Sequence, residues 1–460
     1  MLLSALVQGD DADTALVRSD GRTLTYAALR EAAEIGGRAL TVAGYGPGDV
    51  IAVAVADPSE LLLAAMAVWK SGAAVLPLDA RAGKALLVDP IERSGAAAVV
   101  TALKPDLTLE LEKRDKAAPV DERTGIVLFT SGSSGKPKGV LLGRDGIVAN
   151  VEAICGYLPL AQYGRTAVVL PLFYSYALVG QALTTLRTGG TLVLLSDQPF
   201  PKTQLELMAA QAVNGLSAVP TALRLLARTL PAISPRPQLS LGYVASAGGP
   251  LDAATVKDVR EAFAPKHFFN QYGLTEASPR VTALSDAEAA FERGSVGKPL
   301  PGIEVKQAED GQLLVRGPSV MLGYLGDEAA TRAAMEADWL RTGDQGRVDA
   351  EGYVFITGRN DGIVKVAGER VGLDEVEAAL RGAPGVEDLI VVAVPDEVLG
   401  SRLVALVVGA DGGLRERARE TLPAVKRPSK VLTVTALPKT ANGKPDRAAA
   451  LAEAKRRLGR

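Results

Sequence analysis

The sequence predicts an α/β protein with a large N-terminal domain, made of two α/β subdomains and a small β-barrel-like unit, followed by a small α+β C-terminal domain. Two observations carry this prediction. Apolar strand-like runs alternate with amphipathic helical stretches up to about residue 270, and after Gly294 the sequence pattern changes to short strands separated by turns. A chain of 460 residues also exceeds one ordinary domain.

The first α/β cycle is expected between residue 14 and about residue 195. Strand-like runs at 50–55 and 166–170 accompany a helical stretch at 26–43. A second cycle follows, and its members are helices at 203–214, 222–230 and 253–263 with strands at 242–245 and 267–270. Alternation of this kind favours mostly parallel strands.

The remaining chain is expected to form two smaller pieces. Short strands at 302–306, 312–317 and 352–357, separated by Gly, Pro and Asp, predict an antiparallel or barrel-like unit. The last hundred residues carry a helix at 374–381 and strands at 388–394, 403–408 and 431–434. A polar stretch with glycine at both ends predicts a hinge that makes the small domain mobile. We therefore expect a large domain at 1–357, a hinge at 358–361 and a small domain at 362–460.

Composition excludes several classes of function. Basic and acidic residues number 51 and 53, so the chain has no large net positive charge that would attract nucleic acid or an anionic membrane. Any nucleotide must therefore be bound by a local site. The most apolar long stretch, 61–78, is interrupted by Lys70 and Gly72. We expect it to be a core helix running into a strand, with no membrane span.

Cysteine and histidine usage narrows the chemistry further. Cys155 is the single cysteine, which excludes an internal disulfide and fits a reducing cytoplasm, and the start lacks the basic flank of a signal peptide. His267 is the single histidine and stands beside two phenylalanines, where a core position is expected. Mechanisms that need a histidine base are therefore disfavoured.

The most informative segment is a loop of small residues after the apolar strand 125–129. Glycines and hydroxyl residues leave backbone N–H groups open to an anion, and Lys136 and Lys138 add positive charge. The P-loop pattern of kinases and GTPases fails here, because Thr130 stands where its first glycine belongs and Pro137 follows the lysine. A flexible linker would explain the small residues but neither the lysines nor the strand. The segment predicts a phosphate-binding loop.

This loop resembles the phosphate-binding motif of the adenylate-forming superfamily, which comprises acyl-CoA synthetases, adenylation domains and luciferases. Later segments resemble its other signatures in order and spacing, and they are Tyr-Gly-Leu-Thr-Glu at 272–276, Thr-Gly-Asp at 342–344, Gly-Arg-Asn-Asp at 358–361 with Gly-Glu-Arg at 368–370, and Leu-Pro-Lys-Thr-Ala-Asn-Gly-Lys at 437–444. The resemblance covers nearly the whole chain and is closest in type to the AMP-forming acyl-CoA ligases.

The resemblance implies a site for Mg-ATP. Glu276 is similar to the carboxylate associated with Mg²⁺, with Thr130 as a second metal residue, and Asp344 is similar to the acceptor for the ribose hydroxyls. Lys444, Glu276 and Thr275 are the implied catalytic residues. The implied ATP- or AMP-binding residues are Thr130, Ser131, Gly132, Ser133, Ser134, Gly135, Lys136, Lys138, Gly248, Gly249, Pro250, Asn270, Gln271, Tyr272, Gly273, Thr275, Asp344 and Arg359.

The small domain is implied to serve both half-reactions. Lys444 resembles the lysine that reaches across the domain interface to the carboxylate and α-phosphate during adenylation. Asp361 matches the hinge position. Gly368 matches a glycine that leaves room for a pantetheine arm, with Arg370 nearby. The implied acceptor is coenzyme A or, alternatively, the phosphopantetheine of a carrier protein supplied in trans.

The acid pocket departs from the family pattern. A histidine often follows the Pro-Leu-Phe segment of acyl-CoA synthetases, whereas Tyr174-Ser175-Tyr176 follows Pro171-Leu172-Phe173 here. No aspartate lies between residues 171 and 180, so amino acids are less favoured than fatty, aryl or other simple carboxylic acids. The expected pocket walls are Tyr174, Tyr176, Val219, Pro220 and Ala245.

Each motif also has a purely structural interpretation. Glu276 could start a helix, Thr-Gly-Asp is a common turn, adjacent glycines or Gly368 could form tight turns, and most loop lysines are solvated.

The sequence is compatible with three functions. The leading one is an acid–CoA ligase. The second is a stand-alone adenylation enzyme that loads a carrier protein, which a basic face with Arg415, Arg417, Lys426, Arg427 and Lys430 could meet. The third is a nucleotide-binding protein without turnover.

Overall fold

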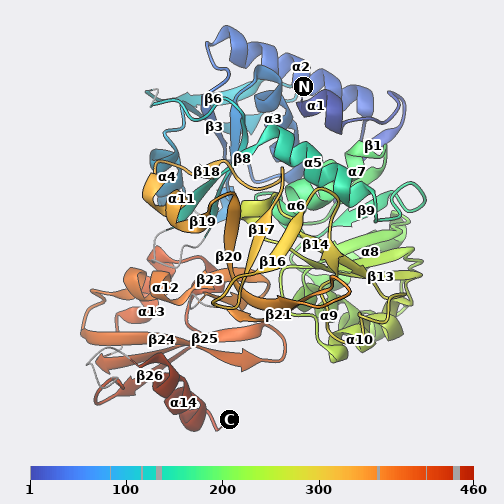
Figure 1. Ribbon diagram of the computed structural model, residues 1–460. Coiled ribbons are helices and arrows are strands. Elements are labelled where there is room, and N and C mark those ends of the chain that lie inside the picture. Colours follow the sequence, from blue (N-terminus) through green and yellow to red (C-terminus); the bar gives the residue numbers. More distant parts are fainter. Residues whose placement is uncertain are drawn as a thin grey trace. The chain divides into compact units, whose positions relative to one another are not determined.

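The computed structural model describes residues 2–82, 84–115, 118–130, 137–359, 363–410, 412–438 and 446–459 (Figure 1). The chain forms two compact units. The large unit comprises Met1–Arg81, Asp89–Phe129 and Gly139–Gly358, and the small unit comprises Ala82–Val88, Thr130–Lys138 and Arg359–Arg460. The hinge and the domain limits predicted from the sequence stay predictions.

A long sheet forms one half of the large unit. Its order is β15-β14-β13-β12-β11-β9-β10-β1-β2, with parallel pairing from β13 through β1 and antiparallel strands at both edges. The strands are β15 (Lys298–Pro299), β14 (Thr282–Ser285), β13 (His267–Tyr272), β12 (Tyr243–Ser246), β11 (Gly215–Ala218), β9 (Arg165–Val168), β10 (Thr191–Leu194), β1 (Thr14–Val17) and β2 (Thr23–Thr25).

A second sheet has the order β18-β8-β7-β4-β3-β5-β6. Its strands are β18 (Gly323–Tyr324), β8 (Lys138–Gly143), β7 (Thr124–Thr130), β4 (Ala74–Pro77), β3 (Val50–Val53), β5 (Ala98–Leu103) and β6 (Leu109–Lys113). The β3, β4 and β5 strands are parallel. β3 and β4 are buried throughout, as expected for strands covered on both faces, whereas β5 is buried only in its first half.

The helices of the large unit connect these strands. They are α1 (Leu2–Leu6), α2 (Tyr26–Val42), α3 (Pro58–Ser71), α4 (Lys84–Ser94), α5 (Arg144–Cys155), α6 (Ser175–Ala177), α7 (Thr184–Arg187), α8 (Pro201–Ala210), α9 (Pro220–Thr229), α10 (Ala253–Phe263) and α11 (Glu328–Ala334). The sequence explains the ends of α3. Asp57 caps its N-terminus by accepting from the amides of Ser59 and Glu60, and Gly72 ends it at φ 87°.

Two hydrophobic clusters hold the large unit together. The first joins both sheets through α3 and α5, with members such as Leu62, Ile126, Ile147 and Tyr243. The second packs α8, α9 and α10 on the opposite face of the long sheet. Figure 1 shows α9 and α10 side by side. The carboxyl ends of β11, β12 and β13 therefore lie between two packed helical layers, where a parallel sheet commonly binds its ligand.

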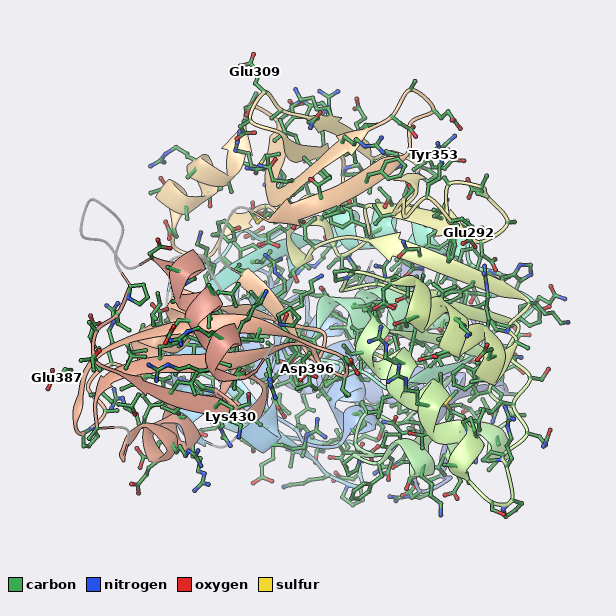
Figure 2. The ribbon with its side chains drawn as sticks, turned by 90° about the horizontal axis from the view of Figure 1, so that it is seen from below. Glu292, Glu309, Tyr353, Glu387, Asp396 and Lys430 are labelled. Carbon is green, nitrogen blue, oxygen red and sulfur yellow. The ribbon has the colours of Figure 1, made fainter. Side chains whose placement is uncertain are left out.

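A third, antiparallel sheet completes the large unit. It has the order β16-β17-β20-β19, and β21 pairs with β20. The strands are β16 (Glu304–Gln307), β17 (Gln312–Arg316), β19 (Met335–Glu336), β20 (Trp339–Val348) and β21 (Val354–Arg359). Tyr353, labelled in Figure 2, donates its hydroxyl to Oε2 of Glu288 across 2.8 Å, which ties this sheet to the loop after β14.

The small unit is an α+β fold of its own. Its strands are β22 (Ile363–Val366) and β23 (Glu369–Gly372), which form a hairpin, and β24 (Val386–Asp396), β25 (Gly400–Gly409) and β26 (Lys430–Val434), which form a sheet. Its helices are α12 (Leu373–Leu380), α13 (Leu414–Thr421) and α14 (Arg447–Arg457). The buried carboxylate of Glu377 accepts from the Val391 amide at 2.8 Å and from Arg447 at 2.7 Å, which compensates its charge.

The predicted α/β class, with a large N-terminal and a small α+β C-terminal part, is confirmed, and most expected elements occur within a few residues of their predicted limits. Residues 61–78 form most of α3 and then β4, as predicted. The core position expected for His267 is wrong. Its side chain is only half-buried, because β13 exposes its first residue at the end of the sheet. Among the described residues, none of the helices combines the length and the apolar character that crossing a membrane requires.

Candidate active site

The centre of the candidate site is a contact between two signature segments. Tyr272 ends β13, and Asp344 lies in β20 and is only 5% exposed. The Tyr272 hydroxyl donates to Oδ2 of Asp344 across 2.7 Å. The Asp344 amide donates to the Thr342 hydroxyl at 3.1 Å, which fixes the turn that carries the carboxylate. The structure thus brings together two of the predicted nucleotide-binding residues.

Glu276 lies in a short 3₁₀ turn, Thr275–Ala277, directly after β13. Its side chain is 6% exposed, and its Oε1 accepts from the hydroxyl of Tyr324 at 3.1 Å. Its carbonyl accepts from the Met321 amide at 2.8 Å. The helix-start interpretation therefore holds in part, but burial and a tyrosine donor also position the carboxylate. A hard, oriented carboxylate oxygen has the chemistry that Mg²⁺ prefers, so Glu276 fits the predicted metal residue.

Gly273 permits this turn. A Cβ atom on Gly273 would stand 1.8 Å from the carbonyl oxygen of Pro279, so no other residue fits without movement of the backbone. The turn returns the chain across itself and places Thr275 and Glu276 beside the strand end. The glycine in this signature is therefore required by close packing.

Thr275 faces the segment expected to open the acid pocket. Its hydroxyl lies 3.1 Å from the hydroxyl of Ser175, which begins α6. The next residue, Tyr176, has its hydroxyl 3.5 Å from the carbonyl oxygens of both Ala218 and Ala245. Tyr176 is thus brought together with one of the expected pocket walls, Ala245, and with Ala218, the residue that precedes the expected wall Val219. Burial raises the pKa of Tyr176, so this hydroxyl stays neutral and can donate a hydrogen bond.

Other expected residues surround these strand ends. Pro220 begins α9 directly after Val219, and Tyr174 precedes α6 with its ring 4.6 Å from that of Phe173. Gly248, Gly249 and Pro250 form the loop after β12, and Gly248 has a φ of 85°. Both conformation and contact restrict this loop, because a Cβ on Gly248 would lie 3.1 Å from Val219.

Asn270 and Gln271 use their side chains within the protein. The Asn270 amide group donates to the carbonyl of Ser295 at 2.9 Å, and the Gln271 amide group donates to the hydroxyl of Tyr157 at 2.6 Å. Both residues therefore support β13 and its neighbours. Their assignment to the nucleotide stays a prediction.

Several predicted residues lie outside the described residues. They are Ser131, Gly132, Ser133, Ser134, Gly135, Lys136, Asp361 and Lys444. Thr130 ends β7 and Lys138 begins β8, on either side of the phosphate loop. Arg359 ends β21, and only its backbone is described.

The small unit contains Gly368 and Arg370 in the β22–β23 hairpin. Gly368 occupies the turn with a φ of 86°, and Arg370 pairs with Lys365 in the register. This is the tight-turn role weighed from the sequence, and it leaves the predicted role beside a pantetheine arm untested.

Two residues in or beside the site carried no motif. Tyr324, in β18, orients Glu276, and Arg280 follows the signature turn. The guanidinium carbon of Arg280 lies 4.6 Å from the ring centroid of Tyr176, and the side chain is 2% exposed. Neither residue has a local sequence signal, because a lone tyrosine or arginine in a loop is usually solvated.

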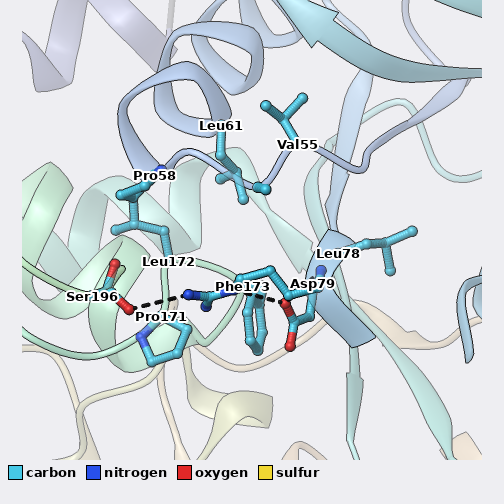
Figure 3. Close-up of a pocket in the computed structure, with 11 residues that line it drawn as sticks. Val55, Pro58, Leu61, Leu78, Asp79, Pro171, Leu172, Phe173 and Ser196 are labelled. Carbon is cyan, nitrogen blue, oxygen red and sulfur yellow. Dashed lines mark hydrogen bonds and ion pairs between the residues drawn. The ribbon is translucent and has the colours of Figure 1, made fainter. Parts of the chain in front are cut away.

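A cavity beside Pro171, Leu172 and Phe173 is not the acid site. Arg81 is among its lining residues, and its guanidinium donates at 3.4 Å to the Ser196 carbonyl and at 3.4 Å to Oδ1 of Asp79. Figure 3 shows Ser196 and Asp79 on opposite sides of this cavity. The remaining space is about 10 Å³. That is room for about one water molecule, so this cavity cannot hold a substrate.

His267 lies in a different groove, of about 330 Å³, together with Tyr157, Phe269 and Glu288. Its described ring neighbours are Tyr163 and Phe269. Within the described ranges, no group of three or more His, Cys, Asp or Glu side chains could hold a metal ion unaided.

Comparison with known proteins agrees with this geometry. The family model described as AMP-binding enzyme matches residues 5–325, and the one described as AMP-binding enzyme C-terminal domain matches residues 375–444. A feruloyl-CoA synthase from an Amycolatopsis species is 32% identical over 465 residues, covering 93% of both chains.

Solved structures of the same architecture are also similar. A double mutant of o-succinylbenzoate CoA synthetase (MenE) from Bacillus subtilis, bound to the product analogue OSB-NCoA, matches with a TM-score of 0.83 at 26% identity, covering 96% of this chain and 95% of that one. The same synthetase with ATP and a magnesium ion matches at 0.66 and 27%, covering 95% and 96%. The amide bond synthetase McbA from Marinactinospora thermotolerans matches at 0.81 and 30%, covering 98% of both.

The matched models span both compact units. In the large unit Tyr272 contacts Asp344, and Glu276 lies in the turn directly after Tyr272. The chain therefore belongs to the AMP-binding enzyme family, within the adenylate-forming superfamily.

Proposed function

We propose that this protein is an AMP-forming acid–CoA ligase. The observation that carries the proposal is the convergence of Asp344, Tyr272, Glu276 and Thr275 at the carboxyl end of β13, in a chain that matches acid–CoA ligases over nearly its whole length. The groups present suit the binding of a ribose, a hard cation and a carboxylate, and that combination is needed to join an acid to AMP.

The first half-reaction joins two anions. A carboxylate oxygen of the acid forms a bond to the α-phosphorus of ATP, while the bond from that phosphorus to the bridging oxygen breaks and pyrophosphate leaves. Asp344, oriented by Tyr272, would accept hydrogen bonds from the ribose. Glu276, oriented by Tyr324, would hold Mg²⁺ together with Thr130. When bound, the cation supplies charge neutralisation at the phosphates.

The second half-reaction moves the acyl group to sulfur. The thiol of coenzyme A loses its proton to solvent, its sulfur bonds to the acyl carbon, and the bond from that carbon to the AMP oxygen breaks. Gly368 and Arg370 are proposed to lie beside the pantetheine arm, Lys444 to act in adenylation, and residues 358–361 to form the hinge between the half-reactions. These roles rest on the family signatures.

The carrier-protein alternative has weaker support. Lys426 forms an ion pair with Glu375, and Arg417 and Arg427 donate to backbone carbonyls within the small unit. The charge of Lys426 is thus compensated within the small unit, and Arg417 and Arg427 each have a donor engaged internally, although their charges remain. The similarity to an amide bond synthetase favours a different second candidate, in which an amine accepts the acyl group.

One experiment separates these functions. A panel of carboxylic acids is incubated with Mg-ATP, and pyrophosphate release is measured alone, with coenzyme A, and with simple amines. The ligase proposal expects AMP and an acyl-CoA thioester in equal amounts when coenzyme A is present. Amide formation with no thioester would favour the amine-acceptor function over the ligase function. ATP binding without pyrophosphate release from any acid would contradict both functions.

A further inference from the structure

Arg280 is a buried cation with unsatisfied hydrogen-bonding capacity. It is 2% exposed, and its Nε and Nη2 atoms have no hydrogen-bond acceptor among the described residues. None of the described carboxylates forms an ion pair with it, whereas neighbouring arginines in the sequence, Arg260 and Arg293, each pair with acidic side chains. A guanidinium stays protonated when it is buried, so this positive charge is permanent.

The position of Arg280 is fixed from the backbone. Asn150 of α5 clamps it, because its amide group donates to the Arg280 carbonyl at 2.7 Å and its oxygen accepts from the Arg280 amide at 3.1 Å. The pairing of β13 with β14 then confines the segment from the other side. The fold therefore fixes the position of Arg280, and the charged side chain does not belong to a loosely held loop.

The guanidinium faces the predicted acid pocket. It stacks on the ring of Tyr176, whose hydroxyl approaches the carbonyls of Ala218 and Ala245 at the strand ends. A Cβ on Gly180 would lie 3.3 Å from Nη2, so the glycine at this position spares room beside the cation. Pocket wall and cation thus belong to one cluster.

The surroundings offer hydrogen bonds but no negative charge. The hydroxyls of Tyr157 and Tyr176 both interact with the Arg280 guanidinium, by hydrogen bonding and by charge, but both are neutral groups. Gln271 donates to the Tyr157 hydroxyl, while its own Oε1 lacks a described partner. Burial raises the pKa of Tyr157 to about 12, although the charge of Arg280 opposes the rise, so this phenol is neutral near pH 7. Both amide atoms of the buried Gln181, which follows Gly180, also lack described partners.

A purely structural role explains this arrangement poorly. Stacking on Tyr176 and contact with two neutral hydroxyls offset only part of the cost of burying a guanidinium that has no anionic partner and leaves Nε and Nη2 without acceptors. An apolar side chain of similar volume would pack against Tyr176 without that cost. An anion supplied by a ligand removes the imbalance, because a carboxylate accepts two hydrogen bonds from the guanidinium fork.

We infer that Arg280 binds a second carboxylate of the acid substrate, so that the substrate class is a dicarboxylic acid activated at one end only. The inference rests on the proposed ligase function. One carboxylate forms the bond to the α-phosphorus of ATP, near Thr275. The other stays ionised and pairs with Arg280. Arg280 is then a specificity residue, and it takes no part in bond making.

The test compares acids that share a skeleton. Glutarate, adipate and terephthalate are each paired with their monomethyl esters, and kcat/KM is measured by pyrophosphate release with the wild type and with Arg280→Met. The wild type is expected to favour the best diacid over its ester by about 50-fold, within the range of a charge-assisted hydrogen-bonded pair. R280M is expected to lose about 50-fold on the diacid while changing less than about 3-fold on the ester.

Controls keep the result interpretable. Arg187→Met removes an arginine that pairs with Glu152 outside the pocket, and it should leave the diacid preference unchanged. Thermal shift gives a second readout, since the diacid alone should raise the Tm of the wild type and not that of R280M. If R280M does not fold, the wild-type acid pairs and Arg280→Lys still decide.

Three outcomes would overturn the inference. The first is a wild type that uses monoesters as well as diacids, and the second is an R280M variant that loses the same factor on both classes, which would make Arg280 structural. In either case the ligase function itself survives, because acids are still activated. The third is a wild type that activates no acid of either class, and this would remove the ligase function together with the inference.

Discussion

The Tyr272 hydroxyl and Oδ2 of Asp344 lie 2.7 Å apart although 72 positions separate the two residues in the chain. This hydrogen bond joins the end of the long sheet to the antiparallel sheet. Asp344 is almost fully buried, so its carboxylate has one orientation before any ligand arrives. Preorganisation of this kind is what a ribose-binding carboxylate needs, because no free energy is then spent on ordering it.

Substitution of either partner should weaken nucleotide binding. Asp344→Ala removes hydrogen bonds to a charged acceptor, each contributing about 1.5–3 kcal/mol, so KM for ATP should rise about 100-fold. Tyr272→Phe keeps the ring but loses the orienting donor, and about a 10-fold rise is expected. Both are measured by pyrophosphate exchange at varied ATP. Equal KM values for D344A and wild type would show that Asp344 does not meet the nucleotide.

Glu276 and Tyr324 should act together in the use of Mg²⁺. Glu276→Gln preserves shape and removes charge, so the Mg²⁺ concentration for half-maximal activity should rise at least about 10-fold. Tyr324→Phe removes the donor to Oε1 and should cause a smaller rise in the same direction, about 3-fold. Activity is titrated with Mg²⁺ at fixed ATP. A normal Mg²⁺ dependence in E276Q would assign this carboxylate to a structural role.

The pattern of the chain predicted more of the fold than of the side-chain partners. Periodicity predicts the positions of β3, α3 and β12, because the apolar residues that one strand or helix buries lie close together in the sequence. Signature residues such as Glu276 and Asp344 follow from the resemblance. The role of Tyr324 could not be predicted from the sequence, because its contact with Glu276 spans 48 positions and arises only when the sheets form.

Arg280 shows the same limit from another side. A single arginine after Ser-Pro is usually solvated, and its burial depends on Asn150 and on the pairing of β13 with β14. The prediction for His267 failed in the opposite direction, because it placed a partly exposed residue in the core. Neighbouring phenylalanines suggested a core, whereas β13 is buried on both faces at Phe268 and Phe269 and leaves its first residue partly exposed at a groove.

Gly273 should tolerate no side chain. In Gly273→Ala the new Cβ would meet the Pro279 carbonyl oxygen, so the turn must shift at a cost of about 3 kcal/mol in the free energy of unfolding. Gly46→Ala is a matched control, because its Cβ would have an ordinary contact at 3.7 Å. Thermal unfolding of both variants checks this. A G273A protein as stable and as active as G46A would contradict the tight turn.

Cys155 should titrate late. Burial raises the pKa of its thiol to about 11, so the neutral form dominates in the folded protein and the stabilisation this brings is lost as the pH rises toward 11. The rate of alkylation by iodoacetamide should therefore increase about tenfold per pH unit from 8 to 10. Free glutathione, the control, should approach a plateau near pH 9. A plateau for Cys155 in the same range would show that the thiol is not shielded.

The lysine of the small domain gives the sharpest test of the proposed mechanism. Lys444→Ala removes the point charge predicted at the carboxylate and α-phosphate, so acid-dependent pyrophosphate exchange should fall at least about 1,000-fold. ATP binding should persist, because Asp344 and Tyr272 lie in the large unit. Thioester formation from a synthetic acyl-adenylate should also persist, since that step no longer requires attack at phosphorus. Lys430→Ala, which changes an exposed lysine of the same unit, controls for a general loss of charge. Loss of both half-reactions in K444A would instead indicate that the lysine supports the small domain as a whole, and unchanged exchange would remove it from the adenylation step.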